Sequence, residues 1–368
     1  MRRALLFLND LWRRFLKSRS FWPAGALVAL LAFNLLFTKG FGVIEVRDGR
    51  LYGSAIDILH RGSIVMLLSV GMTLVIATAG IDLSVGSVMA MAGTVAALLL
   101  TSTPPHSAAA AGAVALAVAL AAGLWNGVLV AFLRLQPIVA TLILLVAGRG
   151  IAQLLSEGQR VRFNRPDFEF LGSGSWLGLP FTVFIVAFVV AATLLVTRKT
   201  TAGLTIEAVG SNERASRLSG IRPWLVKLLV YGFCGLCAGI AGLIYTADIK
   251  QGDPLRCGEY VELDAILAVV IGGTPFSGGR ANVLGSILGA LIMQTLTTTI
   301  LTRGVPVEYT LVVKAVVVIA VCLLQSEQFR SILVGGASLP REKTRDGDVP
   351  PTMRTRDGDI PPTGGGAS

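Results

Sequence analysis

The sequence predicts an all-α integral membrane protein, on three observations. The chain has 368 residues, of which 53% are hydrophobic and only 15% charged, and its mean hydropathy is +0.71. A water-soluble domain of this size rarely tolerates such a composition. Apolar runs of about 20 residues, enough for a helix to cross a hydrocarbon core roughly 30 Å thick, recur from Phe21 to Leu324. Runs of this length favour helices over the short alternating strands of a membrane β-barrel.

We expect about ten transmembrane helices, with broken or re-entrant segments among them. The eighth segment is too short to cross the membrane without help from its flanks, so nine or eleven crossings also fit. Residues 1–20 form a basic N-terminal segment, residues 21–326 the membrane domain, and residues 327–368 a tail. The repeat TRDGDVPPT and TRDGDIPPT predicts disorder in that tail from about residue 341. The expected spans are 21–38, 60–79, 84–101, 109–133, 138–156, 180–197, 225–246, 263–274, 281–301 and 308–325.

The positions of the basic residues indicate that both termini are cytoplasmic. With this orientation most of the 32 Lys and Arg residues fall in cytoplasmic segments, as the positive-inside rule requires. The formal net charge of +10 therefore reflects topology, and we expect membrane lipid but no nucleic acid among the partners. The first apolar segment is followed by no typical cleavage site, so we expect it to be retained as a span.

The sequence offers no set of residues typical of an enzyme. His60 and His106 are the only histidines and lie too far apart to suggest a metal pair, so we expect no metal site and no catalytic residues. No lysine follows a glycine, which excludes a Walker A motif and ATP hydrolysis by this polypeptide alone. Cys234 and Cys237 share one face of an apolar helix, where they favour close packing over a redox pair.

The segment 198–225 is the most informative of the cytoplasmic loops. Its pattern predicts one short charged helix from Ile206 to Leu218, ended by Gly220 and followed by Pro223. Such a helix either docks on a protein partner or rests on lipid headgroups, and its narrow apolar face favours the protein. The outer loops 39–59, 157–179 and 247–262 are either docking surfaces for an external partner or simple connections.

Polar residues inside the expected spans are candidates for a translocation path. A charge at the centre of a membrane costs about 2.5–3.5 kcal/mol, so such side chains face the bundle interior or water. The alternative for each of them is that it ties helices together. The candidates are Asp82, Ser84, Asn126, Gln136, Arg149, Gln153, Asp264, Gln294 and Lys314.

Glycines predict two breaks in the helices. In ATAGIDLSVGS, at residues 77–87, Asp82 or Ser84 either caps the next span or lies deeper and lines a path. In IGGTPFSGGRANVLGSILGALI, at residues 271–292, the first part cannot form a regular helix and the second allows close helix packing. The break residues are Gly80, Gly86, Gly272, Gly273, Gly278 and Gly279.

Three motifs in order resemble the membrane permease of ribose-type ATP-binding-cassette (ABC) sugar importers, the branched-chain-amino-acid/ribose permease family. They are GMTLVIATAGIDLSVGSVMAMAG, EAVGSNERASRLSGI and ELDAILAVVIGGTPFSGGR, and the likeness extends from about residue 50 to 326. Within the family, QPIVATLILLVAGRGIAQL and TRKTTAGLTIEAVG are most similar to galactofuranose importer permeases. Pro275 and Phe276 depart from the Ser-Leu that relatives more often have.

This resemblance implies a type II ABC importer-like fold and a set of partners. It implies a separate ATP-hydrolysing subunit that binds ATP and Mg²⁺, a periplasmic sugar-binding protein, and a second permease chain that is identical or paralogous. It implies a bacterial inner membrane location, a sugar substrate and no cofactor on this chain. The residues implied in coupling to the ATPase are Glu207, Ala208, Gly210, Asn212, Glu213 and Gly220.

A transporter or channel that works without an ATPase is the alternative from another class. In that case Asp82, Asp264, Arg149 and Lys314 would be the ion-coupling groups. The loop at 198–225 disfavours this alternative. A membrane-embedded enzyme is a third possibility, and it lacks paired catalytic residues.

Overall fold

The structure is a computed structural model, and it describes residues 21–38, 40–47, 50–304, 306, 309–310, 312–316 and 319. The basic segment 1–20 and the tail 327–368 lie outside the described residues.

The described helices follow the predicted apolar segments closely. Among them, α3, α5, α6, α8, α11 and α13 are long and apolar enough to cross a membrane, while α2 and α4 are shorter and α12 has only 11 residues. A mostly helical membrane protein is therefore confirmed, and the count of about ten crossings stays a prediction. The bounds are α2 (Phe21–Phe37), α3 (Ser54–Ala77), α4 (Val85–Thr101), α5 (Ala108–Ala131), α6 (Pro137–Leu155), α7 (Pro166–Ser173), α8 (Phe181–Lys199), α9 (Thr201–Ser211), α10 (Glu213–Leu218), α11 (Pro223–Ile249), α12 (Val261–Ile271) and α13 (Val283–Thr302).

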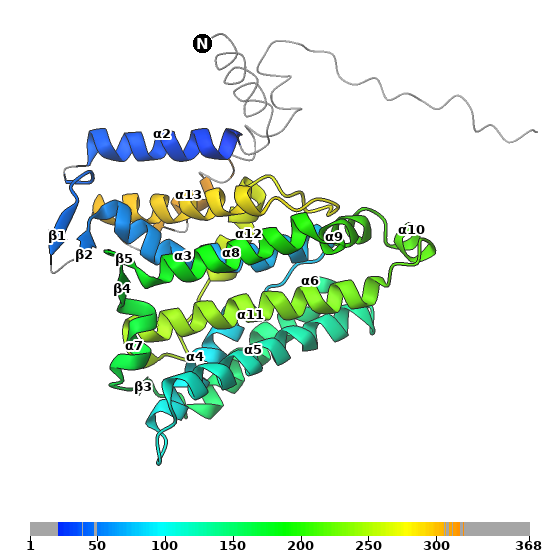
Figure 1. Cartoon of the computed structure of the whole chain (residues 1–368), viewed down its shortest axis with the longest axis horizontal. Helices are drawn as coiled ribbons and strands as arrows, with labels where there is room; N and C mark the ends of the chain where they lie inside the picture. The colour runs from blue at the N-terminus through cyan, green and yellow to red at the C-terminus, as the bar shows by residue number, and fades with distance from the viewer. Residues whose placement is uncertain are drawn as a thin grey trace, which may run out of the picture. The chain divides into compact units, whose positions relative to one another are not determined.

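Three short strand pairs lie at one end of the helices and α9 and α10 at the other (Figure 1). We call these the hairpin end and the α9 end. Each pair is antiparallel, and one joins the two loops that follow α6 and α11. The strands are β1 (Glu45–Arg47) with β2 (Arg50–Tyr52), β3 (Val161–Arg162) with β6 (Gln251–Gly252), and β4 (Ser175–Trp176) with β5 (Leu179–Pro180).

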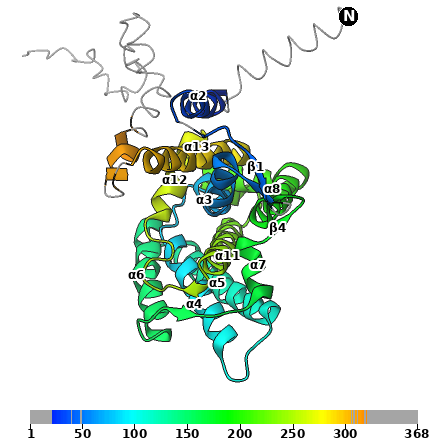
Figure 2. The same cartoon turned by 90° about the vertical axis from the view of Figure 1, so that its left-hand side faces the viewer.

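Helix α11 is the element around which the others pack. It has 27 residues, begins with Pro223 at its first position, and contacts α5, α3, α4 and α7 (Figure 2). On one side, a side chain on Gly123 of α5 would overlap the backbone of α11 at Tyr231. On another, Gly71 of α3 lies against Cys234 and Cys237. Both cysteines are free and buried, and they act as small packing residues.

Helices α12 and α13 are joined by a non-helical segment at residues 272–282. Asn282 caps α13 by accepting a hydrogen bond from the Gly285 amide at 3.1 Å, and it donates to the Gly272 carbonyl at 2.8 Å. Gly289 packs against the backbone of α12 at Ala268, which leaves no room for a side chain there. The short helix and the full one therefore lie in close backbone contact.

Helices α6 and α8 keep much of their apolar surface exposed. Val146 and Leu154 on α6 and Phe188 and Leu195 on α8 are all exposed, whereas α3 is mostly buried from Gly62 onward. Apolar faces of this kind suit lipid or a second membrane chain.

We expect Gly123→Ala to destabilise the folded protein, since the added methyl group meets the backbone of α11 and forces α5 and α11 apart. Overpacking of this kind costs about 1–3 kcal/mol. Gly112→Ala on the same helix is the matched control, because the nearest atom to its new Cβ is 3.9 Å away. The measurement is the thermal unfolding midpoint in detergent. Equal midpoints for the two variants would show that the α5–α11 contact is not tight.

Candidate functional site

The segment between α3 and α4 reaches the middle of the bundle. Gly242 of α11 packs on Met89 of α4, and Thr246 packs on Gly93 with the same spacing, so the two helices run parallel. Extending this register places Val85, where α4 begins, beside Ala238. Ala238 lies about 22 Å from the start of α11, and the whole of α11 is about 40 Å long, at about 1.5 Å per residue. Helix α4 therefore starts about halfway through the bundle.

A buried polar cluster holds this start. The Asp82 carboxylate, whose residue is only 1% exposed, uses its Oδ1 to accept three bonds. The donors are the Ser84 amide at 2.9 Å, the Ser84 hydroxyl at 2.6 Å and the Asn126 side chain at 3.3 Å. Asn126 also donates to the Ser84 Oγ at 2.8 Å. Tyr231 of α11 donates to the Ile81 carbonyl at 3.2 Å. These bonds join the break to α5 and α11.

Of the two predicted caps of α4, the structure shows a bond from Asp82 to the Ser84 amide at the helix start and none from the Ser84 side chain to the first turn. Ser84 occupies the N-cap position, yet its hydroxyl points to Asp82 and accepts nothing from the first turn of α4. Ser87 instead donates to the Ser84 carbonyl at 2.8 Å and to the Leu144 carbonyl of α6 at 3.0 Å. The polar groups of the break therefore bind one another and the neighbouring helices.

The other charged candidates are also paired. Lys314 lies 2.7 Å from the Asp264 carboxylate of α12. Arg149 of α6 donates to the backbone carbonyls of Leu255, Cys257 and Gly258, with its shortest bond, to Cys257, at 2.6 Å. Arg149 thus anchors the loop that precedes α12.

The three predicted glutamines lie apart from this cluster. Gln136 is exposed before α6, Gln153 is half-buried on α6, and Gln294 of α13 lines a cavity at the hairpin end. The nine candidate residues therefore form separate groups within one chain.

At the α9 end, three segments meet at the carbonyl of Ala77, the last residue of α3. The Gly279 amide donates to this carbonyl at 2.9 Å, and a side chain on Gly210 of α9 would overlap it. Beside it, the Glu207 carboxylate of α9 accepts a bond from the Ala281 amide at 3.0 Å. We call Ala77, Glu207, Gly210, Gly279 and Ala281 the junction. It connects α9 to the segment that leads to Asp82.

The single helix predicted from Ile206 to Leu218 is wrong, because Asn212 splits it. Asn212 has extended backbone angles, and its side chain caps α10 by accepting from the Ala215 amide at 3.0 Å. Glu213 then lies 2.7 Å from Lys227, and the hydrogen bond to that ammonium group lowers the pKa of Glu213 below its usual value. Gly220 has φ +85°, as a residue after a helix end often does.

The surface formed by α9 and α10 exposes apolar side chains. Leu204 is 71% exposed and Leu218 90% exposed, beside the exposed Arg214. Glu207 and Gly210 face the membrane helices, so this surface consists of other residues of the loop.

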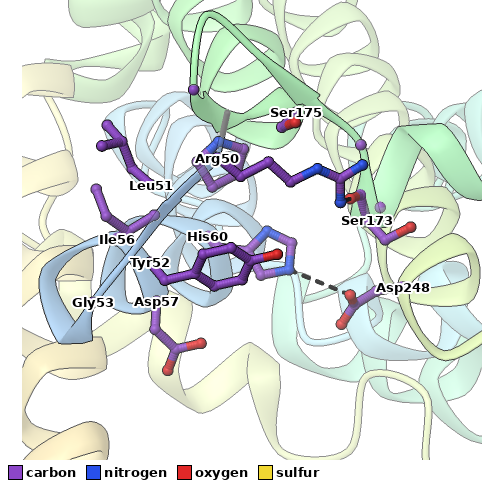
Figure 3. Close-up of a pocket in the computed structure, with 14 residues that line it drawn as sticks. Arg50, Leu51, Tyr52, Gly53, Ile56, Asp57, His60, Ser173, Ser175 and Asp248 are labelled. Atoms are coloured by element: carbon purple, nitrogen blue, oxygen red, sulfur yellow. Dashed lines mark hydrogen bonds and ion pairs between the residues drawn. The ribbon is translucent and has the colours of Figure 1, made fainter. Parts of the chain in front are cut away.

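Two adjoining cavities open at the hairpin end. The outer pocket, of about 330 Å³, lies between β2, the start of α3 and the segment from α7 to β5 (Figure 3). The outer cleft, of about 510 Å³, lies among the ends of α3, α11 and α13. Asp57, His60 and Asp248 line both. His60 stands between them, with Nε2 3.3 Å from Asp248 and Nδ1 3.2 Å from Thr182.

Sequence reasoning missed several residues at these sites. Tyr231 and Ala77 carry no signal in the sequence, because one is an aromatic and the other an alanine within apolar runs. Asp57, Arg61 and Asp248 fall at the ends of apolar runs, where charges are usual. Only their convergence in space distinguishes them.

Comparison with known proteins gives consistent matches. Residues 54–322 match the family model described as the permease component of branched-chain amino acid transport systems. The chain is 50% identical over 333 residues to the galactofuranose transporter permease protein YtfT of Escherichia coli (strain K12), covering 89% of this chain and 96% of the relative. It is 40% identical over 331 residues to the fructose import permease protein FruF of Bifidobacterium longum (strain NCC 2705), covering 88% and 92%. It is 38% identical over 307 residues to the ribose import permease protein RbsC of Escherichia coli (strain K12), covering 82% and 92%. No solved structure matches the chain.

We expect Asp82→Asn to fold with little loss of stability and Asp82→Ala to be strongly destabilised. An asparagine keeps an oxygen where Oδ1 accepts its three bonds, whereas an alanine leaves buried donors unpaired. Each unpaired buried donor costs about 1–3 kcal/mol. Thermal unfolding of the two variants in detergent checks this. If Asp82→Asn loses as much stability as Asp82→Ala, the negative charge and not the acceptor holds the break.

Proposed function

Because the chain belongs to the family of permease components of branched-chain amino acid transport systems, we propose that it is the permease subunit of an ABC importer for a monosaccharide. The named relatives are permeases for galactofuranose, fructose and ribose. This chain is not itself an enzyme. Since it has no Walker A motif, ATP and Mg²⁺ bind to a separate subunit.

The observation that carries the proposal is the exposed surface of α9 and α10. Its leucines, Leu204 and Leu218, would be buried by binding a protein, and we assign that contact to the ATP-hydrolysing subunit. Behind this surface, Glu207 and Gly210 contact the ends of the membrane helices through the junction. A partner that moves α9 would therefore also move the end of α3 and the segment 278–282. Glu207, Ala208, Gly210, Asn212, Glu213 and Gly220 are the residues we assign to this coupling.

Galactofuranose is the substrate that we propose. Identity to the galactofuranose permease is 50%, against 40% and 38% for the fructose and ribose permeases. Ribose and fructose also form five-membered furanose rings, so a pentose or another hexose is the competing outcome of a transport assay.

The α9 end is cytoplasmic in this proposal, and the hairpin end faces the periplasm of a bacterial inner membrane. A periplasmic sugar-binding protein then docks on the hairpin end. The exposed apolar faces of α6 and α8 contact lipid or a second permease chain, identical or paralogous.

An ion-coupled carrier receives less support from the charged groups. Such a carrier needs buried charges that bind and release ions. Here Asp264 pairs with Lys314, Arg149 is bound by backbone carbonyls, and Asp82 is enclosed by its donors. Each of these groups has a structural partner.

We expect uptake of radiolabelled galactose, which in water includes the furanose form, to require all partners. The assay uses proteoliposomes containing this chain, its second permease and the ATPase, with the binding protein outside and ATP inside. Liposomes that lack the ATPase or contain ADP are the controls and should show no uptake above leakage. Uptake driven by an ion gradient alone, without the ATPase, would contradict the proposal.

A further inference from the structure

We propose that the outer cleft is a binding site for the sugar as it enters the permease. This inference rests on the proposed function and adds a place on this chain where the substrate binds. The cleft has a volume of about 510 Å³, which lies within the usual range for small-molecule sites, about 300–1,000 Å³. It opens at the hairpin end, where the sugar-binding protein would release its cargo.

The lining of the cleft has the chemistry that a neutral polyol requires. Within the part of the chain that the structure describes, the Gln294 side-chain oxygen accepts no bond. Asp57 and Asp248 each use one carboxylate oxygen, toward Arg61 and His60, and keep the other free. Amide and carboxylate groups together both donate to and accept from sugar hydroxyls.

Apolar side chains complete the site. Ile64, Ile244 and Leu301 line the same cleft beside the aromatic ring of Tyr245. Small-molecule sites typically combine such apolar and aromatic surface with a few placed polar groups, and a sugar ring presents both C–H and O–H surfaces. The cleft suits a monosaccharide better than a phosphate, because Arg61 is the one arginine among its described lining residues and is already paired with Asp57.

The charged side chains of the cleft indicate that it is in contact with water. The side chains of Asp57, Arg61 and Asp248 are each about half-exposed or more. A charged side chain at the centre of the acyl region would cost about 2.5–3.5 kcal/mol, so the cleft opens to water at the ends of its helices. Helix α3 joins this cleft to the junction, since Asp57, Arg61 and Ile64 lie near its start and Ala77 at its end. A shift of α3 at the junction would change the cleft.

The test measures sugar imported per ATP hydrolysed in the complete complex, with radiolabelled galactose as the probe. Gln294→Leu removes an amide whose one bond in the described structure is the long one from its nitrogen to Thr298, at 3.4 Å. Asp248→Asn replaces one carboxylate oxygen with a donor and keeps an oxygen for His60, so folding should change little in either variant. We expect the ratio to fall about 2- to 10-fold for each variant, the effect of one lost hydrogen bond. Gln159→Leu, an exposed glutamine at the same end and outside the cleft, is the matched control and should keep the ratio.

An unchanged ratio in both variants, in a complex that imports galactose, would overturn the cleft as a sugar site and leave the proposed function intact. A wild-type complex that imports no galactose would instead contradict the proposed function. Accessibility gives a second measurement. Thr297→Cys in the cleft should react with a membrane-impermeant maleimide added outside, above the labelling of the wild-type chain. Absence of labelling would show that lipid or the second permease covers the cleft, which would also overturn the inference.

Discussion

The Asp82 carboxylate is the group on which the arrangement of the bundle depends. A helix that starts inside a membrane leaves backbone amides and carbonyls without partners, and no water is present to satisfy them. Asp82 binds Ser84 and Asn126, and Tyr231 binds the carbonyl of Ile81, so side chains of the bundle supply partners to the break. From this fixed start α4 runs along α11 with glycines in the contact. A chain that must cross a membrane can therefore stop a helix at mid-depth only because side chains from α5 and α11 reach it.

The same break is connected to the α9 end through a contact that contains almost no side chains. Ala77, Gly210 and Gly279 meet by backbone atoms, and Glu207 adds one bond to Ala281. Because close-packed backbone has few alternative arrangements, we expect a displacement of α9 to move the end of α3 as well. The proposed coupling surface, the break at Asp82 and the outer cleft thus lie along one helix or its immediate neighbours. In the proposed function, this connection links ATP hydrolysis on another subunit, at the α9 end, to a sugar bound at the hairpin end.

Much of this could be predicted from the sequence, and the exceptions have physical reasons. Apolar runs located the helices, since length and composition alone decide whether a segment suits a membrane. The split at Asn212 could not be predicted, because asparagine fits either a polar helix face or an N-cap. The depth of Asp82 depends on the register of α4 against α11, helices that lie far apart in sequence. The outer cleft joins the ends of α3, α11 and α13, where each charge by itself resembles an ordinary helix end.

Hydrogen–deuterium exchange in the complete complex tests the central claim, that α9 acts on the break through the junction. With a non-hydrolysable ATP analogue bound to the ATPase, residues 78–84 and 278–282 should change their exchange together with residues 201–218. The hairpin at residues 45–52 serves as the reference. Glu207→Leu, which removes the acceptor for the Ala281 amide, should confine the change to residues 201–218, whereas Glu207→Gln keeps that acceptor and should behave as wild type. A response limited to residues 201–218 in the wild-type complex, or one that is unaltered in Glu207→Leu, would contradict the account.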